Sequence, residues 1–181
     1  MIELRDMRES DIEDYVRWFT ETTDWMRTDA PWENEETTAE AERKSWREYY
    51  EAVRDLPADA VRRKFEIEAD GLHVGWVCRY TDLGEVENPE KLPAVGIDIA
   101  ESAFRGRGVG TEALRAFILY LKEKGFPAVY TQTWSGNAAM MRVAEKLGFT
   151  LCSRLRDIRA VEGKKYDALT YRLELSGAAE E

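Results

Sequence analysis

Arg105-Gly106-Arg107-Gly108-Val109-Gly110-Thr111 is the most informative stretch of the chain because of its position. An alternating stretch typical of a strand precedes it at 94–100, and apolar residues at helical spacing follow it as far as residue 124. Glycines let a backbone approach a ligand closely, and the first amides of a helix point outward at its positive end. A glycine-rich turn between a strand and a helix therefore predicts a site for phosphate or pyrophosphate.

Arg105 and Arg107 add positive charge beside these amides, although the net charge of the chain is −10. This local reversal of sign strengthens the phosphate interpretation. A plain tight turn with two solvated arginines is the simpler alternative. A dinucleotide fingerprint is another, because 108–113 fits Gly-x-Gly-x-x-Ala, but the next strand, 129–134, lacks the acid which that fingerprint requires.

The pattern of apolar residues on either side of this turn predicts the remaining elements. Strands are expected at 2–5, 65–69, 74–80, 94–100, 129–134, 151–161 and 166–175. Helices are expected after the cap at Ser10 and at 35–54, 111–124 and 137–147. One strand-helix-strand crossover among antiparallel hairpins predicts an α+β fold: a mixed, mostly antiparallel central sheet of about seven strands with helices on both faces.

Composition limits the classes of protein to consider. It fits a single domain at 1–175 with a flexible tail at 176–181 that has nothing apolar to bury. The absence of a signal peptide and of a long apolar stretch predicts a cytoplasmic chain with no membrane partner. Cys78 and Cys152 lack the spacing of a zinc site, so both are expected as reduced core residues, with no metal. The acidic charge disfavours nucleic acid as a partner.

Two motifs carry a resemblance to a known family. Arg105-x-x-Gly108-x-Gly110 after a strand resembles the acetyl-CoA pyrophosphate motif of the GNAT superfamily. The segment 137–149 looks like the Asn-x-x-(Ser/Ala)-x-Arg-Val-x-Glu-Lys-x-Gly-Phe segment of its RimJ/RimL-type branch. The resemblance spans nearly the whole chain and is strongest at 95–149. It implies an N-acetyltransferase that takes acetyl-CoA as its co-substrate.

The resemblance also implies which residues hold the co-substrate. In such enzymes the pantetheine arm pairs like an extra strand, here with 97–100, in a splay between that strand and 130–133. The implied residues are Ile99, Ala100, Arg105, Gly106, Arg107, Gly108, Val109, Gly110, Thr111, Asn137, Arg142 and Lys146. A helix N-cap is an equally simple role for Asn137. Many relatives carry a tyrosine general acid where this chain has Ala144, so the thiolate must be protonated by water or a neighbouring group.

Asp98 is the candidate catalytic base. Attack on a thioester requires a neutral amine, so a group must take up its proton near neutral pH. A carboxylate between the apolar neighbours Ile97 and Ile99 must face a polar cleft or be buried at considerable cost. A structural ion pair with an arginine is the alternative. His73, the only histidine, follows a hairpin turn and is expected at the surface rather than as the base.

Trp32, Glu33 and Glu66 are the candidates for binding the amine. Acidic residues gather around an aromatic one between the first two helices and suit a cation; they are Asp29, Trp32, Glu33, Glu35 and Glu36. An acid-rich, solvated helix start is the plainer interpretation. Glu66 and Glu68 share one face of their strand, which either borders the cleft or, more simply, faces solvent.

These observations together predict acetyl transfer from acetyl-CoA to a primary amine by direct attack in a ternary complex. The acceptor is a small cationic amine or a protein N-terminus, and the sequence does not choose between them. A non-catalytic acyl-CoA-binding or regulatory module stays open because of Ala144, as does an interaction domain whose glycine turn binds nothing. Homodimer formation through the C-terminal strands is also open.

Overall fold

The structure is a computed structural model that describes residues 1–33 and 35–175, and it confirms the predicted α+β class. The strands are β1 (Ile2–Arg5), β2 (Lys64–Ala69), β3 (Leu72–Tyr80), β4 (Ala94–Ile99), β5 (Ala128–Trp134), β6 (Thr150–Val161) and β7 (Lys164–Glu174). The helices are α1 (Asp11–Thr20), α2 (Ala39–Val53), α3 (Val109–Glu123) and α4 (Ala138–Lys146), with short 3-10 turns η1 (Thr23–Arg27) and η2 (Ser102–Phe104). The predicted tail at 176–181 lies outside the described residues.

Every predicted strand and helix is present, with ends that differ from the prediction by up to four residues, and two of these differences are informative. Helix α2 begins at Ala39 rather than at 35, because the side chain of Thr38 caps it by accepting a hydrogen bond from the amide of Ala41. Strand β2 begins at Lys64 rather than at 65, and Lys64 pairs with Cys78 of β3. The second difference matters for the site, because it adds a lysine to the sheet.

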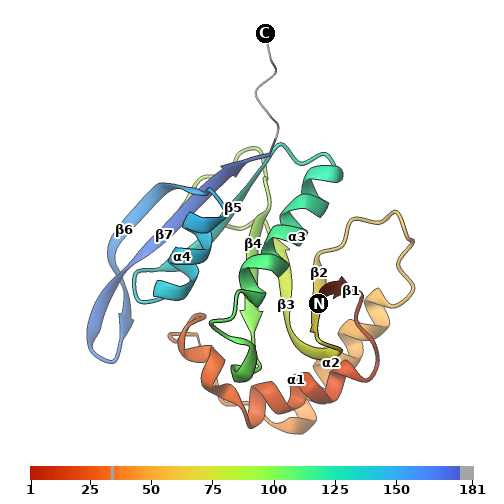
Figure 1. Cartoon of the computed structure of the whole chain (residues 1–181). Coiled ribbons are helices and arrows are strands. Elements are labelled where there is room, and N and C mark those ends of the chain that lie inside the picture. The colour runs from red at the N-terminus through yellow and green to blue at the C-terminus, as the bar shows by residue number, and fades with distance from the viewer. Residues whose placement is uncertain (34, 176–181) are drawn as a thin grey trace.

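A single sheet runs in the order β1-β2-β3-β4-β5-β7-β6 through the described residues (Figure 1). Neighbouring strands are antiparallel except β4 and β5, which are parallel and share one register pair, Ala94 with Tyr130. The hydroxyl of Thr131 still donates to the Val95 carbonyl at 2.8 Å, and beyond this point the two strands part. The predicted splay is therefore present, and none of the described strands covers this edge of β4 near its end.

Helices cover both faces of the sheet. Strand side chains alternate between the faces, so Ile67 and Val77 pack with Leu114 and Phe117 of α3 on one face. On the other face Trp76 packs with Tyr15 and other aromatic residues of α1, η1 and α2. Figure 1 shows α3 and α4 lying across the sheet, with α1 and α2 gathered at one end of it. The aromatic face is the one that contains the cleft described below.

The β6–β7 hairpin forms the far edge of the sheet, where β6 pairs with β7 alone (Figure 1). Cys152 is exposed on β6, so its prediction as a core residue is wrong; an edge strand with one partner leaves much of its surface in water. Cys78 is half-buried, and both thiols are free. No helix among the described residues is long and apolar enough to span a membrane.

Candidate active site

The glycine turn before α3 is exposed and leads into the unpaired amides of the first helical turn. Gly106 and Gly108 have φ angles of 70° and 88°, a left-handed conformation that only glycine adopts without strain. The first intrahelical bond of α3 runs from the Glu112 amide to the Gly108 carbonyl at 3.0 Å, so the amides before Glu112 have no partner within the helix. Residues 106–108 are exposed. The turn therefore offers an accessible anion site at the positive end of a 15-residue helix.

The two arginines of the turn differ in what they contact. The guanidinium of Arg105 donates to the carbonyls of Ile99, at 2.7 Å, and Ala100, at 2.5 Å, and pairs with Asp24 of η1. Its side chain thus ties the end of β4 to η1, and Asp24 offsets its charge. Arg107 is exposed, with a 3.3 Å bond to the Ala103 carbonyl. Arg107 is the arginine that adds charge on the solvent side of the turn.

Asn137 caps a helix and anchors a loop. Its side-chain oxygen accepts from the amide of Met140 at 3.0 Å, and its side-chain nitrogen donates to the Thr28 carbonyl at 2.7 Å. The indole of Trp134 donates to the same carbonyl at 3.0 Å. The N-cap alternative for Asn137 is therefore present, together with a link from α4 to the loop after η1.

The other predicted residues of α4 lie on different sides of the helix. Arg142 and Lys146 are exposed, whereas Ala144 is fully buried in the core under α3. A buried methyl group cannot donate a proton, so position 144 contributes no general acid.

A cleft of about 440 Å³ lies between the aromatic face of the sheet and the segments η1, 29–33 and α2. Aromatic and charged side chains together make up most of its walls. Its lining is Phe19, Trp25, Met26, Asp29, Ala30, Glu33, Trp46, Tyr49, Lys64, Trp76, Cys78 and Asp98. Of the residues singled out from the sequence, Asp29, Glu33 and Asp98 are in this lining. A second hollow, about 680 Å³, is lined by the end of α1, by η1 and by residues 35–37. It contains Glu35 and Glu36 of the predicted acidic group, but neither Asp98 nor any strand residue is in its lining.

Asp98 projects into this cleft from β4, opposite Trp76 of β3 in the register. Removal from water, and then the charge of Asp29, raise the pKa of the Asp98 carboxyl well above its usual range, while Lys64 opposes the rise. Within the described residues no side chain donates a hydrogen bond to Asp98 and no arginine pairs with it. The structural ion pair considered for Asp98 is thus not found, and its carboxyl is free to exchange a proton in the cleft.

Asp29 and Glu33 lie close together in the same cleft. Removal from water and the charge of Glu33 raise the pKa of the Asp29 carboxyl. With Asp98, these side chains make one side of the cleft acidic, which suits an ammonium ion.

Trp32 does not line the cleft. Its ring packs edge-on against Trp134, with centroids 5.7 Å apart, and the guanidinium of Arg159 lies 4.8 Å from it. Its indole donates to Glu33 at 3.2 Å. The structure therefore gives Trp32 a supporting position behind the acidic loop.

Lys64 lines the cleft and was missed because the strand was expected to start one residue later. Its ammonium lies 4.0 Å from the ring centroid of Tyr15 and 4.1 Å from that of Trp46. Burial lowers the pKa of Lys64 to about 8, with Glu66 opposing. The ion-pair distance to Glu66 is 3.6 Å, too long for a hydrogen bond. The alternation of side chains along a strand could have identified it, because Lys64 precedes Glu66 by two residues and so lies on the same face of the strand.

Glu66, predicted to bind the amine or else to face solvent, does neither in the structure and lies behind the cleft. It is 1% exposed because α1 packs over this end of the sheet. The hydroxyl of Tyr15 donates to its carboxylate at 2.5 Å, and Nε2 of His73 lies 3.0 Å from the same oxygen. Glu66 is not in the lining of the cleft, so it does not contact the space in which an amine would bind.

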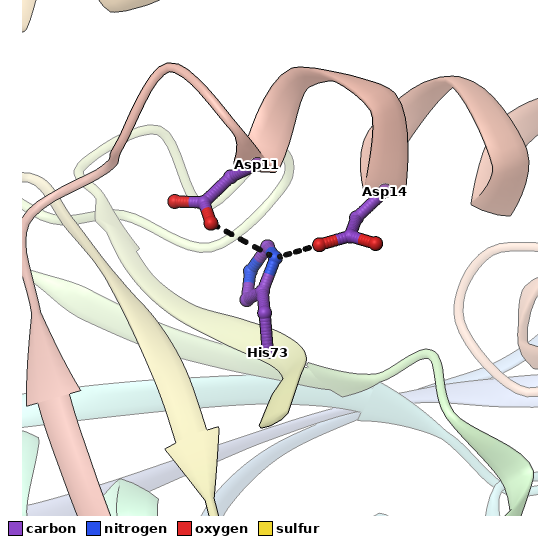
Figure 2. Close-up of side chains that lie close together, drawn as sticks. All are labelled: Asp11, Asp14 and His73. Carbon is purple, nitrogen blue, oxygen red and sulfur yellow. Dashed lines mark hydrogen bonds and ion pairs between the residues drawn. The ribbon is translucent and has the colours of Figure 1, made fainter. Parts of the chain in front are cut away.

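His73 is also buried, contrary to the prediction of a surface residue. Its side chain is 5% exposed because α1 covers the start of β3. Figure 2 shows its Nδ1 between Asp14, at 3.0 Å, and Asp11, at 3.5 Å. Burial opposes protonation, but the hydrogen bonds to Asp14 and Glu66 outweigh it and raise the pKa of His73. Asp11 also pairs with Arg5, so this cluster is a network of ion pairs that fastens α1 to the sheet.

Comparison with known proteins agrees with this geometry. A family model described as an acetyltransferase (GNAT) domain matches residues 2–150. YdaF of Bacillus subtilis (strain 168), which carries the provisional name of a ribosomal N-acetyltransferase, is 31% identical over 108 residues. The aligned stretch covers 59% of this chain and 58% of YdaF, so the match spans little more than half of that relative.

Solved structures of similar fold cover nearly the whole chain. RimL, a ribosomal L7/L12 alpha-N-protein acetyltransferase in complex with coenzyme A, has a TM-score of 0.73 at 18% identity, covering 96% of this chain and 93% of RimL. YncA from Salmonella typhimurium, with its cofactor acetyl-CoA, has a TM-score of 0.72 at 18% identity, covering 100% of this chain and 98% of YncA. At this identity the likeness concerns the fold. Because the family model matches far more than half of the chain, glycine turn and α4 included, the protein belongs to the GNAT acetyltransferase family.

Proposed function

We propose that the protein transfers the acetyl group of acetyl-CoA to a primary amine, of a small molecule or a protein N-terminus, by direct attack in a ternary complex. The observation that carries this proposal is the position of Asp98. Its carboxyl has a raised pKa and lies free in an acidic, aromatic cleft, on the same strand that leads into the glycine turn. Membership of the GNAT family supports the proposal.

The residues at the end of β4 and in the turn fit acetyl-CoA as a co-substrate. A Cβ at Gly106 or Gly108 would meet no atom within 4 Å, so the space beside these two exposed glycines is open. The amides of α3 before Glu112 would hold the pyrophosphate, and Arg107 would add charge. The edge of β4 beyond Ala94, which is not paired with another strand in the part of the chain that the structure describes, would take the pantetheine arm. Acetyl-CoA supplies an activated acyl group when it is bound.

The cleft has the groups needed to bind an amine and to remove its proton. An ammonium ion is attracted by Asp29 and Glu33 and by the faces of aromatic rings. The carboxylate of Asp98 then takes one proton from the ammonium ion and leaves the neutral amine, which is the nucleophile. The raised pKa of Asp98 suits this role, because it brings the pKa of the carboxyl closer to neutral pH.

A coupled assay of CoA release tests the function. The protein is incubated with acetyl-CoA and a panel of primary amines, free thiol is measured, and the product is identified by intact mass. Amine-dependent thiol release with an acetylated product is expected. Thermal stabilisation by CoA without thiol release from any amine would contradict the proposal and indicate a binding module instead.

A further inference from the structure

We propose that Lys64 binds a carboxylate of the acceptor, so that the preferred acceptor is a zwitterion in which a carboxylate stands next to the amine, as in a free α-amino acid. This inference rests on the proposed function and narrows its acceptor class. It is argued from the surroundings of Lys64, the charges on the opposite side of the cleft and the rings between them.

The ammonium group of Lys64 lacks the hydrogen bonds that such a group needs. Its side chain is 9% exposed, and its Nζ is a buried polar atom without a hydrogen-bond partner among the described residues. An ammonium group has three donors, and leaving them unmet in a protein interior costs free energy. Aromatic rings cover part of the charge but accept no conventional hydrogen bond. An oxygen from a ligand would satisfy these donors.

Glu66, the acid nearest to Lys64, is held by other groups. It accepts a hydrogen bond from Tyr15 and contacts the His73 ring, both at one of its two oxygens. Its other oxygen lies 3.6 Å from Nζ. The charge of Glu66 is therefore shared with His73, whereas Lys64 is in the lining of the cleft and is also acted on by Asp98.

The cleft therefore has two sides of opposite sign. Lys64 supplies a cation on β2, whereas Asp29, Glu33 and Asp98 supply acids on the loop and β4. A ligand with separated charges matches both sides at once. A polyamine would bring a second ammonium ion toward Lys64 and be repelled, and an acid without an amine would meet the three carboxyl groups. Because Nζ is covered by the rings, binding of such a ligand requires the flexible lysine side chain to rotate Nζ toward it.

Matched acceptors test the inference. We would compare phenylalanine, its primary amide and phenethylamine, which share a ring and an amine but differ in the carboxylate, and repeat the comparison with methionine and its two analogues. The wild-type protein should favour the amino acid over the decarboxylated amine by about tenfold or more in kcat/KM. The amide, which keeps a carbonyl without charge, should lie between them. An amine used as well as its amino acid, or an amide equal to the acid, would overturn the inference.

Variants of Lys64 separate charge from shape. Lys64→Met keeps most of the side-chain length and removes its charge, so the ratio of kcat/KM for the amino acid to that for phenethylamine should fall to near unity. Circular dichroism and thermal unfolding check that the variant is folded. Lys64→Arg should keep part of the preference. An unchanged preference in Lys64→Met would contradict the proposal.

A binding measurement keeps this inference distinct from the proposed function. Quenching of tryptophan fluorescence reports ligand in the cleft without acetyl-CoA, because Trp25, Trp46 and Trp76 line it. If quenching shows tighter binding of the amino acid than of its decarboxylated amine but no amine gives thiol release, acetyl transfer is refuted and the carboxylate site at Lys64 is supported. If thiol is released but neither turnover nor quenching distinguishes the amino acid from its amine, the carboxylate site alone is refuted. If there is neither thiol release nor a difference in quenching, both proposals are refuted.

Discussion

The glycine turn and the cleft lie on opposite faces of β4, and the chain builds them in different ways. Ile97 and Ile99 point toward the turn, where they would be in contact with a Cβ at Gly110, whereas Asp98 between them points into the cleft. The turn comes from one continuous segment, 105–111. The cleft takes its walls from α1, η1, α2 and three strands, and a network of buried charges fastens α1 beside it. A local motif can thus specify an anion site, whereas an acceptor site depends on long-range packing.

Replacing Asp98 is expected to give the largest effect of these variants, and to change the function of the cleft without changing that of the glycine turn. Asp98→Asn removes the proposed base, so kcat should fall by about 100-fold or more, as is typical when a general base is lost. Binding of acetyl-CoA, followed by thermal shift, should stay unchanged because the turn is on the other face of β4. Asp59→Asn, which alters an exposed acid on a remote loop, serves as the control. Equal loss of acetyl-CoA binding in Asp98→Asn would mean that the two sites are not separate.

His73 tests whether charges hold α1 against the sheet beside the cleft. The pKa of His73 is raised in the folded state, so its contribution to stability is complete below the unfolded pKa of about 6.5 and is lost as pH rises through the folded pKa. His73→Gln should therefore be less stable than wild type at pH 6, by about 2 kcal/mol, and the difference should shrink at higher pH. Urea unfolding from pH 6 to pH 9 measures it. A difference that grows with pH would contradict this network.

A substitution at Gly108 tests whether the turn binds acetyl-CoA, and it leaves the lining of the cleft unchanged. Gly108→Ala should lower stability by about 1 kcal/mol because of its left-handed backbone, and should raise the KM for acetyl-CoA by about tenfold because the new methyl group stands beside the amides. Gly84→Ala is the matched control, since Gly84 also has a positive φ, of 62°, and open space around it. Equal effects of both variants on KM would show that the turn does not bind acetyl-CoA.

The Asp24–Arg105 pair should give the smallest effect. Both side chains are partly exposed, so Asp24→Asn should change the free energy of unfolding by less than about 1 kcal/mol. Arg105 keeps its bonds to the carbonyls of Ile99 and Ala100, and the KM for acetyl-CoA should change less than in Gly108→Ala. A larger change in KM than in Gly108→Ala would mean that this pair, rather than the glycines, controls the co-substrate site.

The same contrast explains how much the sequence could predict. Element order, fold class and the glycine turn follow from local periodicity and motif, and all are present in the structure. Asp98 was found because a carboxylate between two isoleucines is locally anomalous. Glu66 and His73 were misjudged because only the packing of α1, more than 50 residues away along the chain, buries them. Lys64 was missed because one residue of strand extension decides whether it joins the sheet.

The pH dependence of the chemical step tests most directly whether Asp98 takes the amine proton. In the ternary complex at saturating acetyl-CoA and amine, the wild-type kcat should fall on the acidic side, with a pKa above the ordinary value of an aspartate, because the base becomes protonated. Asp98→Asn should keep a low kcat that no longer shows this acidic limb. A variant that retains the wild-type rate and the same acidic limb would contradict the account.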